Sequence, residues 1–356
     1  MGTIGDVARR AGVSTTTVSR HLAGQRVREA AAVQASIEAL EFRASHTARS
    51  LKSGVTRTIG LVVPDVSNPF FAAVAKGVES VSRQLELNVF LSNTDESIEL
   101  ERGVLQGLIG RVDGVILVPA REQSDNTAEL RYEGVPIVLV DRRLRDAGDL
   151  DSVLVDSRGG AFRAVEHLLS FGHQRIGLVS GPLDTTPGQE RYNGFVEALE
   201  SAGVVLDPAL IQTGDFRVDS GYQATLRLLG LPSTVTAIFS ANNLMTVGVL
   251  QALHHMGVRV PDEVSVIGFD DLELAELLSP PLSVIARPAV EQGVLAMRLL
   301  RNRIADNGPE RAQHIVLDTQ LKARGSCATP QRSRNRLTAG TSASSETHFN
   351  RMDRNE

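Results

Sequence analysis

The chain has 356 residues, 42% hydrophobic and 22% charged, which excludes a wholly disordered chain and predicts a soluble globular protein of two or three domains. Its one cysteine, Cys327, falls in a polar stretch, so an internal disulfide scaffold and a cysteine-rich zinc site are excluded. Because no apolar run is long enough for a membrane segment and the N-terminus lacks an apolar signal core, we expect a cytoplasmic protein with no membrane partner.

The formal net charge of −5 is unevenly distributed along the chain. Residues 1–58 contain nine Arg or Lys and four Asp or Glu, residues 325–356 have a balance of +2, and the long segment between them sums to −12. A small basic module therefore precedes a large acidic body. This asymmetry favours a polyanionic partner for the N-terminal module, although a basic segment is as often plain solvated surface.

The first 40 residues predict three short helices. Thr3 and Asp6 form a capping pair at the start of "IGDVARRA", whose apolar residues follow helical spacing. Gly12 is expected to end this helix, and Ser14 to cap a second one that closes at Gly24. The next apolar-periodic stretch predicts the third helix.

The segment "DVARRAGVSTTTVSR" has the pattern of a helix, a tight turn and a second helix. In a helix-turn-helix module the N-terminal residues of the second helix enter the major groove of DNA. We expect Thr15, Thr16 and Arg20 to read base edges, and Ser14 and Ser19 to serve caps and phosphates. A plain helical hairpin has the same spacing and stays open as the alternative. The other candidates for DNA contact in this module are Thr3, Thr17 and Arg26.

From residue 59 onward, ten short apolar runs alternate with amphipathic stretches at 70–85, 97–110, 157–171, 190–202, 218–230 and 244–257. Strands that are apolar throughout and alternate with helices predict buried parallel sheets. Ten strands favour two doubly wound sheets over one. From residue 326 the composition becomes Ser, Thr, Arg and Asn, and we expect a disordered tail over 326–356.

Many phrases of the chain, in order and with matching spacing, resemble the LacI/GalR family of bacterial transcription regulators. They include "TIGDVARRAGVSTTTVSRHLAG", "TIGLVVPDVSNPFF", "GHQRIGLVSGP", "AIFSANNLMTVGVLQAL" and "VPDEVSVIGFDD". The resemblance implies a homodimeric repressor that binds palindromic operator DNA, with an α/β effector domain of two doubly wound lobes, similar to periplasmic sugar-binding proteins. It divides the chain into an all-α headpiece at 1–44, a hinge helix and linker at 45–58, and a ligand-binding and dimerisation domain at 59–325.

Residues 45–52, "SHTARSLK", match the family's hinge helix, which the resemblance implies folds on operator DNA and inserts a leucine into the minor groove. Leu51 stands at that position, and Arg49 and Lys52 flank it. An apolar wedge unstacks a base step and bends the duplex, while the basic side chains neutralise phosphates. A simple linker is the alternative. The chain departs from the family pattern after Gly24, where the loop is shorter, and near the hinge at residues 42 and 44.

Polar and aromatic side chains follow several of the predicted strands. In parallel sheets ligands bind at the carboxyl ends of the strands. Asn68, Phe70 and Phe71 follow the first strand and suit a sugar ring, and Asp141 and Arg142 end another strand. Helix capping and core packing are the alternative roles for these side chains.

The resemblance adds two residues to the expected ligand site. Arg191 and Asp270 fall on the family's ligand-contacting Arg and Asp, for which a salt bridge between lobes is the alternative. Phe216 and either Asn242 or Asn243 complete the rim. A carbohydrate or sugar acid is the expected effector. Because Thr185 stands where purine-sensing members carry an Arg, a purine is not expected.

Signals for catalysis are poor. The chain has no nucleophile elbow, no zinc-protease motif and no phosphate-binding loop, and its eight histidines lack metal spacing. The adjacent carboxylates Asp270 and Asp271 are more typical of ligand and cap residues than of acid/base chemistry. We therefore expect a ligand-responsive repressor with no catalytic residue, metal or cofactor. The alternatives are a cytoplasmic solute-binding sensor with impaired or no DNA binding and, less favoured, an α/β enzyme.

Overall fold

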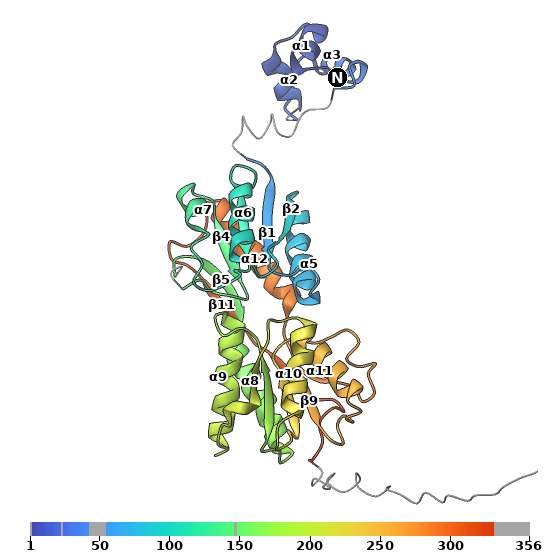
Figure 1. The fold of residues 1–356 in the computed structure, drawn as a ribbon. Helices are drawn as coiled ribbons and strands as arrows, with labels where there is room; N and C mark the ends of the chain where they lie inside the picture. The colour runs from blue at the N-terminus through green and yellow to red at the C-terminus, as the bar shows by residue number, and fades with distance from the viewer. Residues whose placement is uncertain (1, 23, 43–54, 146–147, 331–356) are drawn as a thin grey trace, which may run out of the picture.

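The computed structural model describes residues 2–22, 24–42, 55–145 and 148–330, and it forms a helical headpiece and a body of two stacked lobes (Figure 1). The predicted hinge residues Arg49, Leu51 and Lys52 lie outside the described ranges.

The headpiece consists of α1 (Ile4–Ala11), α2 (Thr15–Leu22) and α3 (Ala30–Ala39). The predicted caps are confirmed: Thr3 and Asp6 form a complete capping box, and Gly12 ends α1 with a φ of 69°, which favours glycine. Ser14 Oγ accepts a hydrogen bond from the backbone N of Thr17 at 3.2 Å at the start of α2. Val7, Val18 and Val33, one from each helix, form the buried core that holds the module together.

The first lobe is built on a six-stranded parallel sheet in the order β11, β5, β4, β3, β1, β2. Helices α5 and α12 pack on one face of the sheet and α6 and α7 on the other. The strands are β1 (Thr58–Val63), β2 (Asn88–Asn93), β3 (Gly114–Leu117), β4 (Ile137–Val140), β5 (Asp151–Val155) and β11 (His314–Leu317); the helices are α5 (Pro69–Gln84), α6 (Ile98–Leu108), α7 (Ala128–Tyr132) and α12 (Ala289–Ile304).

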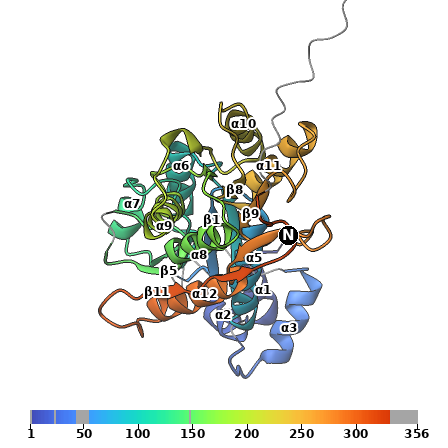
Figure 2. The same cartoon turned by 90° about the horizontal axis from the view of Figure 1, so that it is seen from below.

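The second lobe holds another six-stranded sheet, in the order β12, β10, β9, β8, β6, β7. Its helices pack in two pairs, α8 with α9 and α10 with α11, and Figure 2 shows β8 and β9 between the pairs. The strands are β6 (Ile176–Ser180), β7 (Ile211–Thr213), β8 (Ala237–Ser240), β9 (Ser265–Phe269), β10 (Ser283–Ala286) and β12 (Gln320–Lys322); the helices are α8 (Ser157–Ser170), α9 (Thr186–Ser201), α10 (Val218–Leu229) and α11 (Asn243–His255), with a short 3-10 helix at Pro208–Leu210.

The chain crosses between the lobes three times, after β5, after β10 and after β11. The predicted fold class, two doubly wound lobes behind a helical headpiece, is confirmed. Two strands and two helices were not expected from the sequence. The strands β11 and β12 alternate in exposure, as edge strands do. Of the helices, α7 is only five residues long, and α12 returns the chain from the second lobe to the first. β12 pairs antiparallel with β10, unlike the other strands.

The expectation that Cys327 lies in a polar tail is wrong. Cys327 is buried with the core of the second lobe, and its Sγ lies 3.4 Å from the carbonyl oxygen of Val266. Ser326 is also buried, and its Oγ donates to the same carbonyl at 2.6 Å and accepts from the backbone N of Ser283 at 2.8 Å. These bonds extend the folded body past residue 325, because the segment completes the hydrogen bonding of neighbouring strands.

Candidate functional site

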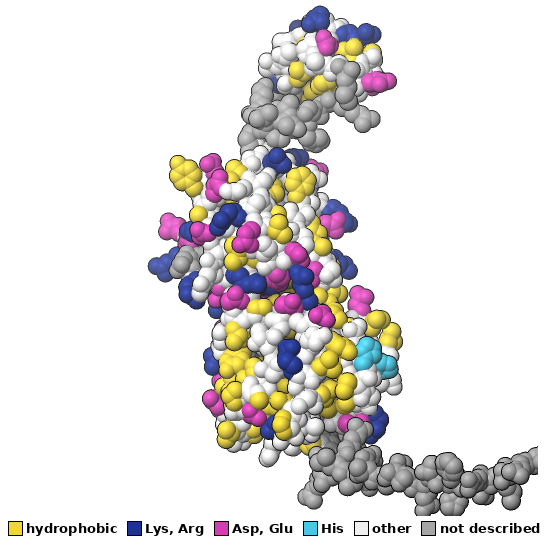
Figure 3. All heavy atoms as spheres, viewed as in Figure 1, with side chains coloured by type: hydrophobic (Ala, Val, Ile, Leu, Met, Phe, Trp, Pro, Cys, Tyr) yellow, Lys and Arg dark blue, Asp and Glu magenta, His cyan; other side chains and the backbone are white. Residues whose placement is uncertain are grey.

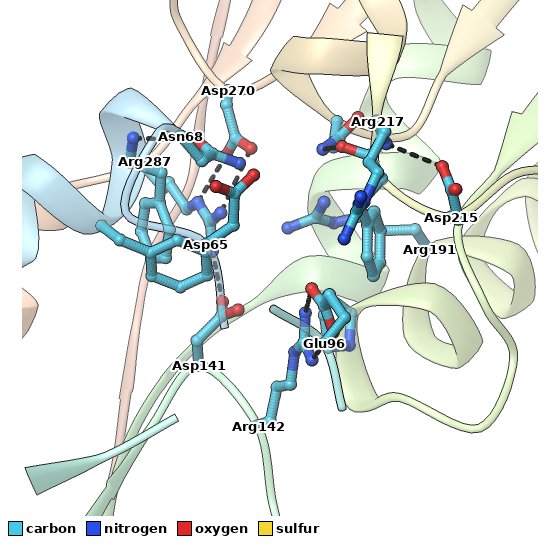
Figure 4. A pocket seen from close by; sticks show the side chains of 15 residues that line it. Asp65, Asn68, Glu96, Asp141, Arg142, Arg191, Asp215, Arg217, Asp270 and Arg287 are labelled. Carbon is cyan, nitrogen blue, oxygen red and sulfur yellow. Dashed lines mark hydrogen bonds and ion pairs between the residues drawn. The ribbon is translucent and has the colours of Figure 1, made fainter. Parts of the chain in front are cut away.

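A cleft between the two lobes collects all nine sequence-predicted ligand residues (Figure 4). It lies where strands of both sheets end, as expected for parallel sheets. The predicted residues that line it are Asn68, Phe70, Phe71, Asp141, Arg142, Arg191, Phe216, Asn242 and Asp270. Six further lining residues were not predicted: Asp65, Glu96, Pro187, Asp215, Arg217 and Arg287.

Helix starts and strand ends position these side chains. Asn68 caps α5 by accepting from the backbone N of Phe70 at 3.0 Å, and Asn242 caps α11 by accepting from the backbone N of Met245 at 2.8 Å. Asp141 follows β4 and Asp270 follows β9, with φ values of 65° and 74°. A non-glycine residue in this left-handed region carries strain, and such residues cluster at binding sites.

Arg287, which the sequence analysis missed, bridges the two lobes at the centre of the cleft. Its guanidinium pairs with Asp141 of the first lobe and with both carboxylate oxygens of Asp270 of the second. It also lies over the ring of Phe70, with the guanidinium carbon 3.3 Å from the ring centroid. The signal that could have found it is the one that pointed to Asp141, because Arg287 directly follows the end of a strand, β10.

Arg142 is tied to the first lobe by a bidentate ion pair. Its two terminal nitrogens each lie 2.7 Å from an oxygen of Glu96, and Nη1 also donates to the carbonyl oxygen of Pro119 at 3.1 Å. Burial lowers the pKa of Arg142, but the negative charge and hydrogen bonds of Glu96 outweigh burial and leave the pKa raised. Arg142 therefore stays charged and fixed in place.

Arg191 is a buried cation without a carboxylate partner of its own. Only 1% of it is exposed, and within the described residues its one hydrogen bond goes from Nη1 to the carbonyl oxygen of Ala241. Nε and Nη2 are buried without a partner there, and the guanidinium carbon lies 3.7 Å from the ring centroid of Phe269. Burial lowers its pKa to about 10, against the opposing charge of Asp270. Two donors are thus available to acceptor atoms of a bound molecule.

The lobes are closed on each other in this structure. Asn243 of the second lobe bonds to Asn68 of the first, Arg121 pairs with Asp184 at 3.0 Å, and Arg217 pairs with Asp95 at 2.7 Å. Figure 3 shows acidic and basic side chains gathered at the level where the lobes meet. The closed cleft keeps a free volume of about 20 Å³, which suits one or two water molecules and is too small for a sugar ring.

The headpiece places the predicted base readers on one face of α2. Thr15, Thr16 and Arg20 are exposed, whereas Val18 is buried against the other two helices. At 3.6 residues per turn, the three exposed side chains fall within a sector of roughly 140°. Nε of Arg20 donates to Oε1 of Gln25 at 3.0 Å. Of the remaining candidates, Thr3, Ser14 and Arg26 are exposed and Thr17 and Ser19 are half-buried.

A large apolar groove lies beside the cleft, with a volume of about 1490 Å³. Its walls come from α5 and α12 of the first lobe and from α11 and the segment 270–274 of the second. Leu274 is 64% exposed and Val290 42% exposed on these walls. An apolar surface of this kind marks a site of association.

Within the described part of the chain, no helix is long and apolar enough to cross a membrane. The same residues contain no group of three or more His, Cys, Asp or Glu side chains placed to hold a metal ion.

The comparisons with known proteins agree with this architecture. Residues 3–44 match the bacterial regulatory proteins of the lacI family, and residues 165–327 match a periplasmic binding protein-like domain. The ribose operon repressor of Escherichia coli (strain K12) is 38% identical over 331 residues, covering 92% of this chain and 100% of the relative.

Two solved structures cover the headpiece as well as the body. The transcriptional regulator CelR in complex with cellobiose is 32% identical, covers 92% of this chain and 100% of its own, and superposes with a TM-score of 0.72. The Lac repressor dimer bound to operator and the anti-inducer ONPF is 26% identical, covers 92% and 99%, and gives a TM-score of 0.80. The chain belongs to the LacI family of bacterial regulatory proteins.

Proposed function

We propose that the protein is a sequence-specific transcriptional repressor that binds palindromic operator DNA as a homodimer and whose operator affinity is controlled by a small-molecule effector. One observation carries the proposal: the same chain joins a headpiece with an exposed polar face on α2 to a two-lobed body with a polar cleft. A solute-binding sensor without DNA function does not require an exposed polar face on α2. A regulator of this kind works in the cytoplasm.

In this proposal α2 is the recognition helix. Thr15 and Thr16 contact bases or thymine methyl groups, and Arg20 pairs with guanine once its guanidinium leaves Gln25. Residues around these readers contact the DNA backbone and fix the register: Thr3, Ser14, Thr17, Ser19 and Arg26. In the hinge, Leu51 wedges into the minor groove between the basic side chains of Arg49 and Lys52.

The effector site is the interlobe cleft, and its ligand is a carbohydrate or sugar acid. Relatives support this class, since one is named for the ribose operon and another is solved with cellobiose. Asp141 and Asp270 accept hydrogen bonds from hydroxyls, Arg191 donates to ligand oxygens, and Phe70 offers a ring face. Thr185 serves the fold: its Oγ1 bonds to Pro182 and accepts from Gly188 at the start of α9.

The remaining lining residues from the sequence analysis complete the cleft. Arg142 and Phe216 lie against each other, with the guanidinium carbon 5.5 Å from the ring centroid, and Nδ2 of Asn242 donates to the carbonyl oxygen of Phe216 at 3.0 Å. Phe71 packs edge-on against Phe70 at 4.9 Å. These contacts orient the aromatic faces that a sugar ring would meet.

The apolar groove is the surface for a second copy of the chain. Both lobes contribute walls to it, Leu274 and Val290 are exposed there, and the Lac repressor that superposes at a TM-score of 0.80 was solved as a dimer. A two-fold dimer places two headpieces side by side, which matches a palindromic operator.

The chain is assigned no catalytic residue and no cofactor. The relatives are transcriptional regulators. The adjacent carboxylates of Asp270 and Asp271 have different surroundings and do not act as a pair. Asp270 faces the cleft, whereas Asp271 pairs with Lys322 at 2.7 Å and with Arg324 at 3.1 Å.

The test is selection of bound sequences from a random DNA pool with the full-length protein, followed by fluorescence anisotropy on the selected site. The proposal expects a palindromic site and an affinity that changes when a carbohydrate from a panel of sugars, sugar acids and nucleosides is added. If no sequence is enriched, the proposal of a sequence-specific repressor is contradicted. A change in affinity with nucleosides alone contradicts the effector class.

A further inference from the structure

Arg287 lies on the wall that the cleft and the groove share. Phe70, Asp270 and Arg287 are the residues that line both cavities. Arg287 stands in the short segment that carries the chain from β10 of the second lobe to α12 of the first. A movement of this side chain therefore changes both the effector site and the subunit surface.

The Arg287 guanidinium fills the place that a polyhydroxylated ring requires. It stacks on the face of Phe70 and pairs with the carboxylates of Asp141 and Asp270, one from each lobe. Its side chain is 6% exposed, and little free volume remains beside it. A sugar held by the same ring face and the same two carboxylates cannot bind while Arg287 stays there.

The charges of the cleft determine which class of ligand can replace the Arg287 guanidinium. The three most buried arginines of the cleft, Arg142, Arg191 and Arg287, face the carboxylates of Glu96, Asp141 and Asp270. With the more exposed Asp65, Asp215 and Arg217, the lining has five carboxylates and four arginines. Removal of the Arg287 cation increases this excess of negative charge beside the ligand. An unpaired buried carboxylate is costly, and an added anion would raise that cost, whereas the hydroxyl groups of a neutral ligand donate hydrogen bonds to both carboxylates.

The groove offers a place for the displaced side chain. Its wall carries the carboxylates of Asp271, Glu273 and Glu291 and the cations of Lys76 and Arg298. Asp271 is already paired with Lys322 and Arg324, whereas Glu273 and Glu291 pair with no basic side chain among the described residues. A guanidinium that leaves the cleft thus finds two carboxylates on the groove side, Glu273 and Glu291, that have no ion pair among those residues.

We infer that Arg287 is a displaceable latch: it ties the two lobes together through Asp141 and Asp270, and the effector, a neutral polyhydroxylated compound rather than a sugar acid, takes its place on these carboxylates and moves it toward the groove. This inference rests on the proposed effector site. It narrows the ligand class to neutral sugars and names the side chain that links the cleft to the subunit surface.

The first measurement needs no effector. Spin labels at Tyr132→Cys in the first lobe and Val205→Cys in the second, both native residues about nine-tenths exposed, report the distance between lobes in full-length protein diluted with unlabelled chain. Arg287→Gln is expected to shift the distribution to longer distances. The matched control Asp184→Asn removes an interlobe ion pair whose two members, Arg121 and Asp184, lie outside the cleft lining, and it is expected to keep the parent distribution. Equal distributions for parent and Arg287→Gln overturn the latch.

The second measurement is calorimetry with pairs of ring sugars that differ in one carboxylate, each aldohexose against its uronate. The parent is expected to bind an aldohexose more tightly than the uronate, and Arg287→Gln to bind that aldohexose about tenfold more tightly than the parent, because no ion pair has to be broken. A parent that prefers the uronate, or an Arg287→Gln variant that loses aldohexose binding, overturns displacement. If neither protein binds any probe, the proposed effector class is wrong. The distance measurement then still tests whether Arg287 holds the lobes together.

Discussion

Asn243 donates a hydrogen bond from Nδ2 to Oδ1 of Asn68 over 2.8 Å, and both side chains are buried between the lobes. Asn68 caps α5 of the first lobe, and Asn243 begins α11 of the second. Both helices also form walls of the apolar groove. Opening of the cleft therefore separates groove walls as well, so the state of the cleft and the shape of the subunit surface are linked through helix ends.

The headpiece assignment predicts distinct effects for two arginines. Arg20→Ala is expected to cost about 1–3 kcal/mol on the selected operator and to relax preference at one base position, because a bidentate contact to guanine is lost. Arg10→Ala removes the same charge from the exposed end of α1 and is expected to leave the base preference unchanged. Anisotropy on all single-base variants of the operator measures both. An unaltered preference profile for Arg20→Ala contradicts its role as a reader.

The hinge assignment predicts a change in DNA shape. Leu51→Ala is expected to reduce operator bending and to weaken specific binding by roughly 1–3 kcal/mol, because the unstacked base step loses its apolar wedge. Lys52→Gln serves as the contrast, since it should flatten the salt dependence of binding and keep the bend. Circular-permutation gel shifts measure the bend. If the Leu51→Ala complex is bent like the parent, residues 45–52 are a simple linker.

The groove assignment predicts loss of the dimer when charge enters it. Leu274→Asp is expected to raise the dissociation constant of the dimer at least about tenfold, because a carboxylate would be buried without a partner. Val205→Asp introduces the same charge at a site that is 90% exposed on the second lobe and should leave the dimer intact. Sedimentation velocity across a concentration series separates the two outcomes. A Leu274→Asp protein that stays dimeric would place the subunit interface elsewhere.

Sequence reasoning found the cleft by two routes: a rule about strand ends, which covers many of its residues, and the family resemblance, which singled out Arg191 and Asp270. Asp141 and Asp270 each follow a strand that is apolar throughout, and the carboxyl ends of parallel strands meet at one edge. The same rule fits Arg287, but its partner Asp141 lies 146 residues away, and that pairing exists only because the crossing after β10 brings the lobes together. Cys327 was misplaced for a related reason: local composition cannot show that a polar segment completes the hydrogen bonds of a distant sheet.

The effector assignment predicts a variant that binds DNA but ignores the ligand. Asp270→Ala removes an acceptor of charged hydrogen bonds from the cleft and is expected to weaken effector binding by roughly 1.5–3 kcal/mol without touching the headpiece. Asp271→Ala, one residue along the chain, removes a carboxylate that faces Lys322 and Arg324 and should keep the effector response. Operator affinity with and without the effector is the measurement. Full response in Asp270→Ala would remove this carboxylate from the site.

One buried histidine, His173, and one half-buried histidine, His167, predict that the body loses stability in mild acid. Burial lowers the pKa of His173, which bonds to Thr236 at 2.9 Å and to Ser265 at 3.1 Å, and burial lowers the pKa of His167 as well. Since the unfolded chain titrates near 6.5, it binds more protons than the folded chain below that pH. The stabilisation is thus complete above pH 6.5 and is lost as the pH falls through the folded-state pKa. Urea midpoints at pH 7.5 and 5.5 should show the decline, and His173→Gln should reduce it and leave the share of His167. A midpoint for the parent that is the same at both pH values contradicts the neutral state of these two rings in the folded protein.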